Sequence, residues 1–543
     1  MLASSLLVPM DITPVGLFRA FAHQLPALTY NTLLAAAGYS ENGSHQDLLT
    51  ELITLWARPA LRTPAALLKS QQVFNFDYGV WGRIWISKWT IPVDHTHVNA
   101  SGCEKLAQNS IKEDSGRIEA GMSLQEAVKV AMLELVDHSS KVNGFSPSQY
   151  SMPDLHPVQT EWTAYRRNVS HFAVRPGFSE REMYKAMMED TNESGPTILY
   201  FHGGAHCLMD PVTHRWPTSM LSQKSNGRVL SVRYRLAPQH IFPAALIDAL
   251  SAYLALTAPP LHAFHEAVPP SQIVLAGDSS GGGLAASLLL LLQTLCRQKH
   301  RITFHGKVIA IPDPVCAGLA VTSPWLDITR SLPSTRANAR WDIIAPPPPI
   351  NQNPTPAFPP DAIWPASPPR VETYCSAQLC IHPLVSPLAA QPHHWRGVPP
   401  VYVSVGWEGM QDEAEVFARR VFSADPDTQI VVFDGYEGMP HCFALFPWNW
   451  AGRKAVDQWA EFCSNVVQPC ALSRTDVGAW TNSKTKDVKQ IRLRDLAAST
   501  VGCWYEREAL HDDVVDQKLV EAQIWRVILD RDIVQQWERD RKA

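Results

Sequence analysis

The sequence lacks the features that mark metal sites, nucleic-acid surfaces and membrane spans. Its ten cysteines, in a chain of 543 residues, form no C-x-x-C pair, so we expect neither a bound metal nor the dense disulfide framework of a small secreted protein. No basic block stands out against a net charge of -5, which argues against a nucleic-acid partner. No apolar run reaches the roughly 18 residues of a membrane span, and the longest, Leu284 to Leu295, has the length of a buried helix.

The N-terminus also lacks a strong targeting signal. Residues 1–10 contain a short apolar run, without the charged segment and the long hydrophobic stretch of a secretory signal peptide. We therefore expect a cytoplasmic protein, with association with the endoplasmic reticulum as the alternative and peripheral membrane contact as a minority interpretation of the N-terminal region. Four N-x-S/T sequons favour a secretory route only slightly, because chance supplies about half as many. They lie at Asn42, Asn99, Asn168 and Asn192.

The sequence does have apolar material for a large core, at 45% hydrophobic residues, and it divides into three regions. Residues 1–157 are predicted to be an N-terminal helical or cap region, because apolar residues recur there at helical spacing. Residues 158–470 are predicted to be the main domain. Within it, the proline-rich insertion 345–370 can form neither a helix nor a central strand and is expected to be an exposed loop. Residues 471–543 are predicted to be a C-terminal helical extension.

Short apolar strands alternate with helices through the main domain. This rhythm predicts an α/β fold with a mostly parallel central sheet and helices on both faces, because strands joined through helices run in the same direction. The carboxyl ends of such strands meet at one edge, where functional loops gather. The predicted strands are 197–201, 228–233, 272–276, 401–405 and 429–433, and the predicted helices include 244–256 and 412–421.

The most informative motif is Gly277-Asp278-Ser279-Ser280-Gly281, a G-x-S-x-G pentapeptide. An apolar strand precedes it and a small-residue, leucine-rich segment follows, which is the order strand, sharp turn, helix. A nucleophile elbow imposes strained backbone angles on its serine, and neighbours larger than glycine would clash with the crossing strand and helix. The turn lifts the hydroxyl into a cleft above the helix N-terminus. Ser279 is therefore predicted to be a nucleophile.

A serine hydroxyl is a weak nucleophile at neutral pH, so it needs a base, and the base needs an orienting carboxylate. The elbow predicts the chain order serine, acid, histidine. His441 follows the strand 429–433 and is predicted to be the base. Two carboxylates follow the strand 401–405. Glu408 is favoured because it lies in the loop at the carboxyl end of that strand, whereas Asp412 begins the next helix and can serve as an N-cap.

Acyl transfer also requires hydrogen-bond donors for the oxyanion. The segment His202-Gly203-Gly204-Ala205 follows the strand 197–201, and two adjacent glycines let backbone N–H groups point into a pocket without side-chain obstruction. We predict a hole of three amides, those of Gly203, Gly204 and Ser280. A plain turn between strand and helix is the alternative for this segment alone.

Taken together, these segments resemble the hormone-sensitive-lipase family of α/β-hydrolases, which includes arylacetamide deacetylases and bacterial esterases. The resemblance extends over residues 160–465, and the overall layout is most similar to fungal steryl acetyl hydrolase-like proteins. The matching segments are His202 to Ala205, Tyr234 to Pro238, Phe242 to Ala245, Gly277 to Gly282, Ser323 to Asp327, His382 to Leu384 and the surroundings of Glu408 and His441.

The resemblance implies an α/β-hydrolase fold, with residues 158–470 as the catalytic domain. It also implies catalytic roles for Ser279 and His441. The family usually has Asp where this chain has Glu408, and Asp412 matches a second, usually non-catalytic acid. Asp278 and Asp248 match positions that support the structure.

The implied reaction is hydrolysis of a small acyl ester of an apolar alcohol through an acyl-enzyme, without metal or cofactor. Trp325 and Trp407 are expected near the alcohol. Two other interpretations stay open. The same serine can serve an acyltransferase or a ring-closing enzyme of specialised metabolism, and some relatives are receptors that bind a ligand without turnover. Because such receptors have lost the catalytic histidine, His441 disfavours the receptor. The oligomeric state is left open.

Overall fold

A computed structural model of the chain describes most of its residues. The N-terminal segment, and with it the expectation about targeting, lies outside the described residues. The described residues are 25–40, 42–62, 65–94, 121–136, 152–353, 358–446, 449–468 and 471–542.

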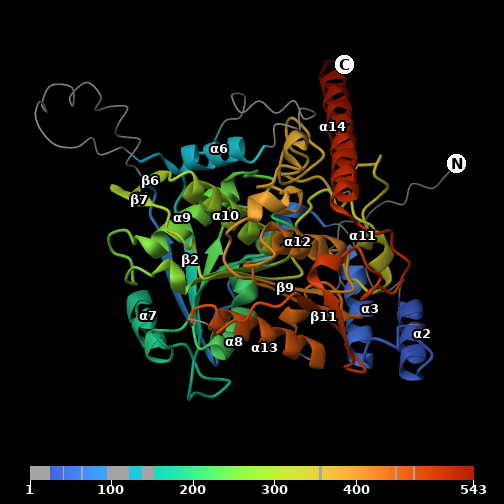
Figure 1. Cartoon of the computed structure of the whole chain (residues 1–543), viewed down its shortest axis with the longest axis horizontal. Coiled ribbons are helices and arrows are strands. Elements are labelled where there is room, and N and C mark those ends of the chain that lie inside the picture. Colours follow the sequence, from blue (N-terminus) through green and yellow to red (C-terminus); the bar gives the residue numbers. More distant parts are fainter. Residues whose placement is uncertain are drawn as a thin grey trace, which may run out of the picture.

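Within the described ranges, ten strands form one sheet in the order β1-β2-β4-β3-β5-β8-β9-β10-β11-β12 (Figure 1). The strands from β4 to β11 are all parallel, and β1, β2 and β12 complete the edges with antiparallel pairings. The predicted mostly parallel sheet is therefore confirmed. The strands are β1 (Ile84–Ile91), β2 (Val158–Tyr165), β3 (Thr197–Phe201), β4 (Arg228–Arg233), β5 (Ile273–Asp278), β8 (Gly318–Thr322), β9 (Val401–Gly406), β10 (Val431–Glu437), β11 (Val477–Asn482) and β12 (Val488–Arg492). A separate hairpin consists of β6 (Arg301–Phe304) and β7 (Lys307–Ala310).

Helices cover both faces of the sheet (Figure 1). Strand β3 shows why both faces are apolar, because successive side chains point to opposite sides. Ile198 and Tyr200 pack in one hydrophobic cluster and Leu199 and Phe201 in another. The first cluster lies under α8 (Pro211–Ser225) and α13 (Trp450–Asn465). The helices of the other face are α6 (Leu124–Glu134), α9 (Ala244–Thr257), α10 (Ser279–Arg297) and α12 (Gln411–Ala424).

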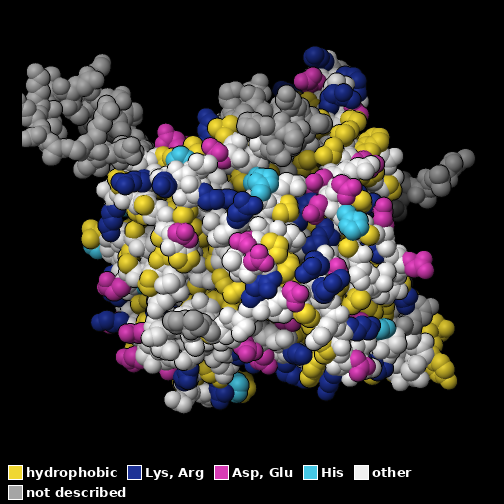
Figure 2. Space-filling view, in the orientation of Figure 1, with side chains coloured by type: hydrophobic (Ala, Val, Ile, Leu, Met, Phe, Trp, Pro, Cys, Tyr) yellow, Lys and Arg dark blue, Asp and Glu magenta, His cyan; other side chains and the backbone are white. Residues whose placement is uncertain are grey.

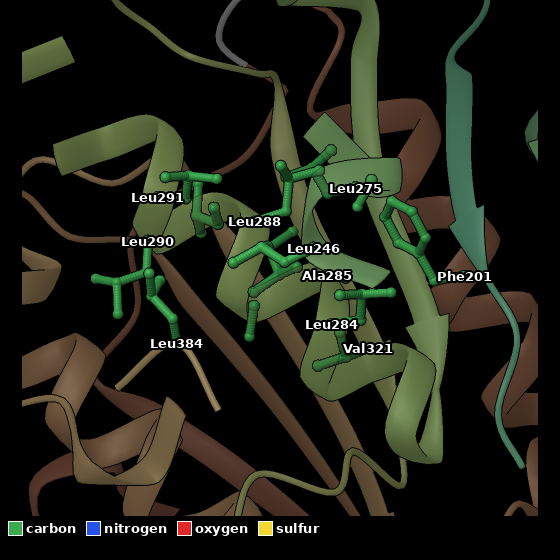
Figure 3. Packing of buried hydrophobic residues seen from close by; sticks show 14 of the residues in the cluster. Phe201, Leu246, Leu275, Leu284, Ala285, Leu288, Leu290, Leu291, Val321 and Leu384 are labelled. Carbon is green, nitrogen blue, oxygen red and sulfur yellow. The ribbon is translucent and has the colours of Figure 1, made fainter. Parts of the chain in front are cut away.

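The apolar run in α10 is the centre of the larger cluster (Figure 3). Leu284 and Leu288 lie among side chains of the sheet and of α9, including Phe201, Leu275 and Leu246. Among the described residues, α10 is the one helix long and apolar enough to cross a membrane, but 94% of its apolar window is buried in the protein. Each fully buried leucine contributes about 1.5–3 kcal/mol to the free energy of folding. This run therefore belongs to the hydrophobic core, as the sequence predicted.

The C-terminal residues differ from the expected helical extension. They contribute β11 and β12 to the sheet before the long helix α14 (Asp512–Lys542), because Trp480 of β11 is buried against Phe433 of β10. The free end of α14 projects from the body and carries basic side chains (Figures 1 and 2). Over the rest of the face in Figure 2, acidic and basic side chains are interspersed.

The N-terminal region is helical but also contributes β1 to the edge of the sheet. Its described helices include α2 (Leu25–Ala36), α3 (Leu48–Arg62), α4 (Leu67–Phe74) and α6, and the other helices of the chain include α7 (Glu180–Glu189) and α11 (Ser334–Ala337). The described residues of the insertion 345–370 form neither helix nor strand, as predicted. They are not fully exposed, however, since the Trp364 side chain is buried in the core.

Candidate active site

Ser279 lies on a sharp turn between β5 and α10, with a left-handed backbone φ of 50°. The glycines on either side are required by close backbone contacts. A Cβ atom on Gly277 would lie 2.5 Å from the carbonyl carbon of Gly281, and one on Gly281 would lie 2.0 Å from the carbonyl oxygen of Phe201. The strand, elbow and helix therefore meet too closely for any larger residue, as the motif predicted.

The sheet brings Ser279, His441 and Glu408 together from three loops. His441 Nε2 lies 2.9 Å from Ser279 Oγ, and His441 Nδ1 makes a short hydrogen bond with Glu408 Oε2. The three residues are 7%, 5% and 0% exposed, respectively, so the chain of hydrogen bonds is shielded from water. Such shielding strengthens each electrostatic contact. The arrangement can pass the serine proton to an oriented imidazole.

The Glu408 side chain is held by further donors. Its Oε1 accepts hydrogen bonds from Ser323 Oγ at 2.6 Å and from the Gly406 amide at 3.1 Å. Ser323 Oγ in turn accepts from the Cys442 amide at 3.0 Å, next to the base. Sequence reasoning missed this role of Ser323, although it begins one of the segments that carry the resemblance and directly follows the central strand β8.

Burial and charge act in opposite directions on His441. Burial disfavours the imidazolium, but the negative charge of Glu408 and its hydrogen bond outweigh burial, so the pKa of His441 is raised above its usual value. Asp342 and Asp278 raise this pKa further. The histidine is thus a stronger base than a free imidazole.

Asp412, the second carboxylate that follows β9, has partners other than His441. Asp412 Oδ1 accepts a hydrogen bond from Arg507 Nη1 at 2.6 Å, and Asp412 Oδ2 accepts from the Ser334 amide at 2.8 Å. Arg507 also pairs with Glu415, and all three charged side chains are fully buried. Asp412 therefore belongs to a buried ion cluster, and the geometry brings Glu408 to His441.

In the segment His202 to Ala205, one of the amides predicted to bind the oxyanion already has a hydrogen-bond acceptor. The Gly203 amide donates to Asp278 Oδ1 at 3.1 Å, so it is already engaged and does not suit the predicted role. The next two residues, Gly204 and Ala205, have left-handed φ angles of 111° and 54°. In the described part of the chain, the amides of Gly204, Ala205 and Ser280 have no hydrogen-bond acceptor. The sequence prediction did not include the Ala205 amide, because the two adjacent glycines were the expected donors.

Asp278 connects the loop that contains Gly203 to the turn that contains Ser279. Besides the Gly203 amide, its Oδ1 accepts a hydrogen bond from Tyr200 Oη at 2.6 Å and lies 3.3 Å from His214 Nε2. Burial alone would raise the pKa of Asp278, but the charge of His214 and these hydrogen bonds lower it. Reciprocally, Asp278 outweighs burial and raises the pKa of His214. Asp278 and His214 therefore form a buried, mutually stabilising pair next to the nucleophile, in agreement with the structural role that the resemblance implied.

The two tryptophans expected near the substrate have different environments. Trp325 is half-buried, and its amide donates to the carbonyl oxygen of Ser279 at 2.8 Å. The His206 ring lies 6.0 Å from Trp325 and stacks on Tyr374 at 3.8 Å. Trp407 is only 2% exposed, and its Nε1 donates to the carbonyl oxygen of Gly502, so it supports the acid loop from the interior. Trp407 therefore lies next to Glu408, but its side chain is buried, and its contact with a substrate stays a prediction.

Comparisons with known proteins bear on this site. A model of the α/β-hydrolase fold matches residues 198–445, which include all three residues of the hydrogen-bonded chain. An acetyl-hydrolase from Streptomyces hygroscopicus is 27% identical over 272 residues, which make up 49% of this chain and 74% of that protein. A solved esterase of the bacterial hormone-sensitive lipase family is 26% identical and covers 57% of this chain and 82% of its own, with a TM-score of 0.41. The chain has the α/β-hydrolase fold over these matched residues.

The hydrolase is also similar to an esterase from Acinetobacter venetianus, at 28% identity over 50% of this chain and 75% of that protein. It is a carboxylic ester hydrolase. The matched residues exclude the described N-terminal residues 25–94 and C-terminal residues 471–542. Among the described residues, no group of three or more His, Cys, Asp or Glu side chains could hold a metal ion.

Proposed function

We propose that this hydrolase cleaves small acyl esters of apolar alcohols, with Ser279 as nucleophile, His441 as general base and Glu408 as the orienting acid. The observation that carries this proposal is the buried chain from Ser279 Oγ through both ring nitrogens of His441 to Glu408. The serine contacts a base, and the base contacts a carboxylate, as a serine nucleophile requires. In the sequence, the three residues follow the order serine, acid, histidine that is found in α/β-hydrolases.

In the first half of the reaction, His441 Nε2 takes the proton of Ser279 Oγ while that oxygen attacks the ester carbonyl. Glu408 stabilises the imidazolium that forms and keeps Nδ1 protonated. The negative oxygen of the tetrahedral intermediate is received by the amides of Gly204, Ala205 and Ser280. When the bond to the alcohol oxygen breaks, His441 returns the proton to that oxygen and the acyl-serine remains.

In the second half, water takes the place of the alcohol. His441 removes a proton from water, the hydroxide oxygen adds to the acyl carbon, and the same three amides receive the oxyanion. Collapse of this intermediate releases the carboxylic acid, and His441 returns the proton to Ser279 Oγ.

Two observations support the substrate class. The half-buried Trp325 is joined through its amide to the carbonyl oxygen of Ser279, which keeps an apolar residue near the nucleophile, and the His206 ring lies near Trp325 and stacks on Tyr374. The relatives are named an acetyl-hydrolase and an esterase, which favours a short acyl group.

The test is hydrolysis of p-nitrophenyl acetate by Ser279→Ala, with Ser287→Ala as a matched control. Ser287 lies further along the same helix and is also buried. We expect the first variant to lose hydrolysis while it keeps the melting temperature of the wild type, and the second to retain activity. Turnover at the wild-type rate in Ser279→Ala would refute the proposed nucleophile. Product analysis with an added alcohol distinguishes hydrolysis from acyl transfer.

A further inference from the structure

One buried carboxylate joins the two loops that carry the acid and the base. Asp342 follows η3 (Asn338–Arg340) in the long connection between β8 and β9, and it is 2% exposed. Its Oδ1 accepts a hydrogen bond from the His441 amide at 3.1 Å, and its Oδ2 accepts one from the Gly409 amide at 2.7 Å. Gly409 is the residue after Glu408, so the two oxygens hold the backbones of adjacent functional loops.

The N-terminal helix α3 holds the backbone of Asp342. The carbonyl oxygen of Asp342 accepts from Arg58 Nε and from Arg62 Nη2, both at 2.9 Å. Arg62 also donates to the carbonyl oxygens of Ala339 at 2.9 Å and Ile344 at 3.0 Å. These contacts leave the segment around Asp342 little freedom to shift. Helix α3 lies outside the residues 198–445 that the family model matches.

A fixed separation matters because Glu408 and His441 lie on loops at the ends of two different strands. The strands β9 and β10 fix where the two loops begin. The hydrogen bond between the side chains of Glu408 and His441 also requires the loop residues themselves to stay in place. A misplacement of about 1 Å in a catalytic constellation can cost about 100-fold in rate. A carboxylate that binds both loop backbones is a direct means of preventing such a shift.

We propose that Asp342 is a positioning residue for ester hydrolysis, because its carboxylate sets the separation between Glu408 and His441. The proposal rests on the function proposed above for these two residues. Asp342 also contributes negative charge near the base. The carboxylates that favour the imidazolium of His441 are Glu408, Asp342 and Asp278. Loss of the Asp342 charge therefore has a kinetic signature beyond a change in stability.

The experiment compares Asp342→Asn and Asp342→Ala with Asp327→Asn in the full-length hydrolase. Asp327 is a matched control, because it is equally buried in the same connection and accepts the amides of Thr329 at 2.9 Å and Ser331 at 2.8 Å. Its partners are in its own turn and not in the two functional loops. The measurements are kcat and KM for p-nitrophenyl acetate across pH, the rate at which a fluorophosphonate labels Ser279, and the melting temperature.

We expect kcat to fall about 100-fold in Asp342→Ala and about tenfold in Asp342→Asn, which keeps one acceptor oxygen, with KM nearly unchanged. In both variants the acid limb of kcat/KM moves to lower pH, because an anion that favours the imidazolium is gone while the burial of His441 remains. Asp327→Asn is expected to change the melting temperature without moving the acid limb. Asp342→Asn provides this readout if Asp342→Ala does not fold.

Wild-type kcat and an unmoved acid limb in a folded Asp342→Asn would overturn the proposal, as would an equal shift of the acid limb in Asp327→Asn. The labelling rate separates this failure from failure of the proposed function. If Ser279 is labelled and Ser279→Ala is inactive while the Asp342 variants behave as wild type, only the positioning role is wrong. If Ser279→Ala hydrolyses the ester normally, the proposed function is wrong and the positioning role falls with it.

Discussion

Replacement of Glu408 by Gln removes one charge from the centre of the site with almost no change in volume. In the wild type, Oε2 of Glu408 accepts from His441 Nδ1, and Oε1 accepts from Ser323 and from the Gly406 amide. A glutamine has only one acceptor oxygen. Whichever way its amide turns, the NH2 group faces another N–H, either that of His441 or that of Gly406. One buried donor is left unsatisfied, or the imidazole changes tautomer and can no longer accept the serine proton.

The expected loss follows from this geometry. A wrong tautomer in a serine triad lowers the rate by about 10⁴-fold, so we expect kcat/KM to fall by about 10³–10⁴-fold, or about 4 to 5 kcal/mol. The residual activity should also have a displaced pH profile. The base must be neutral, so wild-type activity is lost as pH falls through the raised pKa of His441. In Glu408→Gln the acid limb moves to lower pH, because burial still opposes the imidazolium and its main anionic partner is gone.

The assay is p-nitrophenyl acetate hydrolysis from about pH 5 to about pH 8, with Asp412→Asn measured beside Glu408→Gln. Asp412→Asn weakens the buried ion cluster with Arg507 and should cost about 3 kcal/mol of folding free energy, while the acid limb stays where it is. If Asp412→Asn instead moved the acid limb and Glu408→Gln retained wild-type activity, the assignment of the acid would be refuted.

Two further changes test the oxyanion loop and the extended sheet. Gly204→Ala places a Cβ atom 2.1 Å from the carbonyl oxygen of Leu208 at a left-handed φ of 111°, and we expect kcat to fall about 10²-fold or more as the donors move. Gly306→Ala, at a left-handed φ with open space around it, should keep its activity in the same assay. Trp480→Ala removes a fully buried ring from β11 and should cost about 3 to 5 kcal/mol in urea unfolding, against about 0.5 kcal/mol for Trp216→Ala on the surface. Equal losses in the two tryptophan variants would show that β11 does not stabilise the fold.

The site residues that the sequence could predict are those that the order of the parallel strands places at the same edge of the sheet. Parallel strands end at one edge of the sheet, so residues that follow β5, β9 and β10 meet there although they are far apart in the chain. Ser279, Glu408 and His441 were predictable for this reason, and the glycines of the elbow revealed where the strand turns into a helix. The choice between Glu408 and Asp412 rested on which residue begins the helix. That detail was wrong, because α12 begins at Gln411 with Met410 as its N-cap, and Asp412 lies within its first turn.

The parts that sequence could not predict depend on contacts without a pattern. Gly203 donates its amide to Asp278, which is 75 residues away, and any buried acceptor in that place would have had the same effect. Asp342 is one of many aspartates, and nothing local marks it as the partner of backbone amides in two other loops. Strand β11 was missed although it is as long as β9, because its sequence VGAWTN lacks a continuous apolar run. Its place in the sheet comes from pairing with β10 and from the burial of Trp480.

The residues outside the matched family segment have a common relation to the two functional loops. On the acid side, the C-terminal region supplies the carbonyl oxygen of Gly502 to Trp407, and Trp504 Nε1 donates to Asn338, whose side chain holds the Glu408 carbonyl at 2.9 Å. On the base side, Gln46 Nε2 donates to the carbonyl oxygen of Gly438 at 2.6 Å. Extended loops gain order only when their backbone groups find partners, because each fixed residue costs about 1–2 kcal/mol in conformational entropy. The N-terminal and C-terminal regions supply such partners at the loops of Glu408 and His441, which makes them parts of the active-site scaffold.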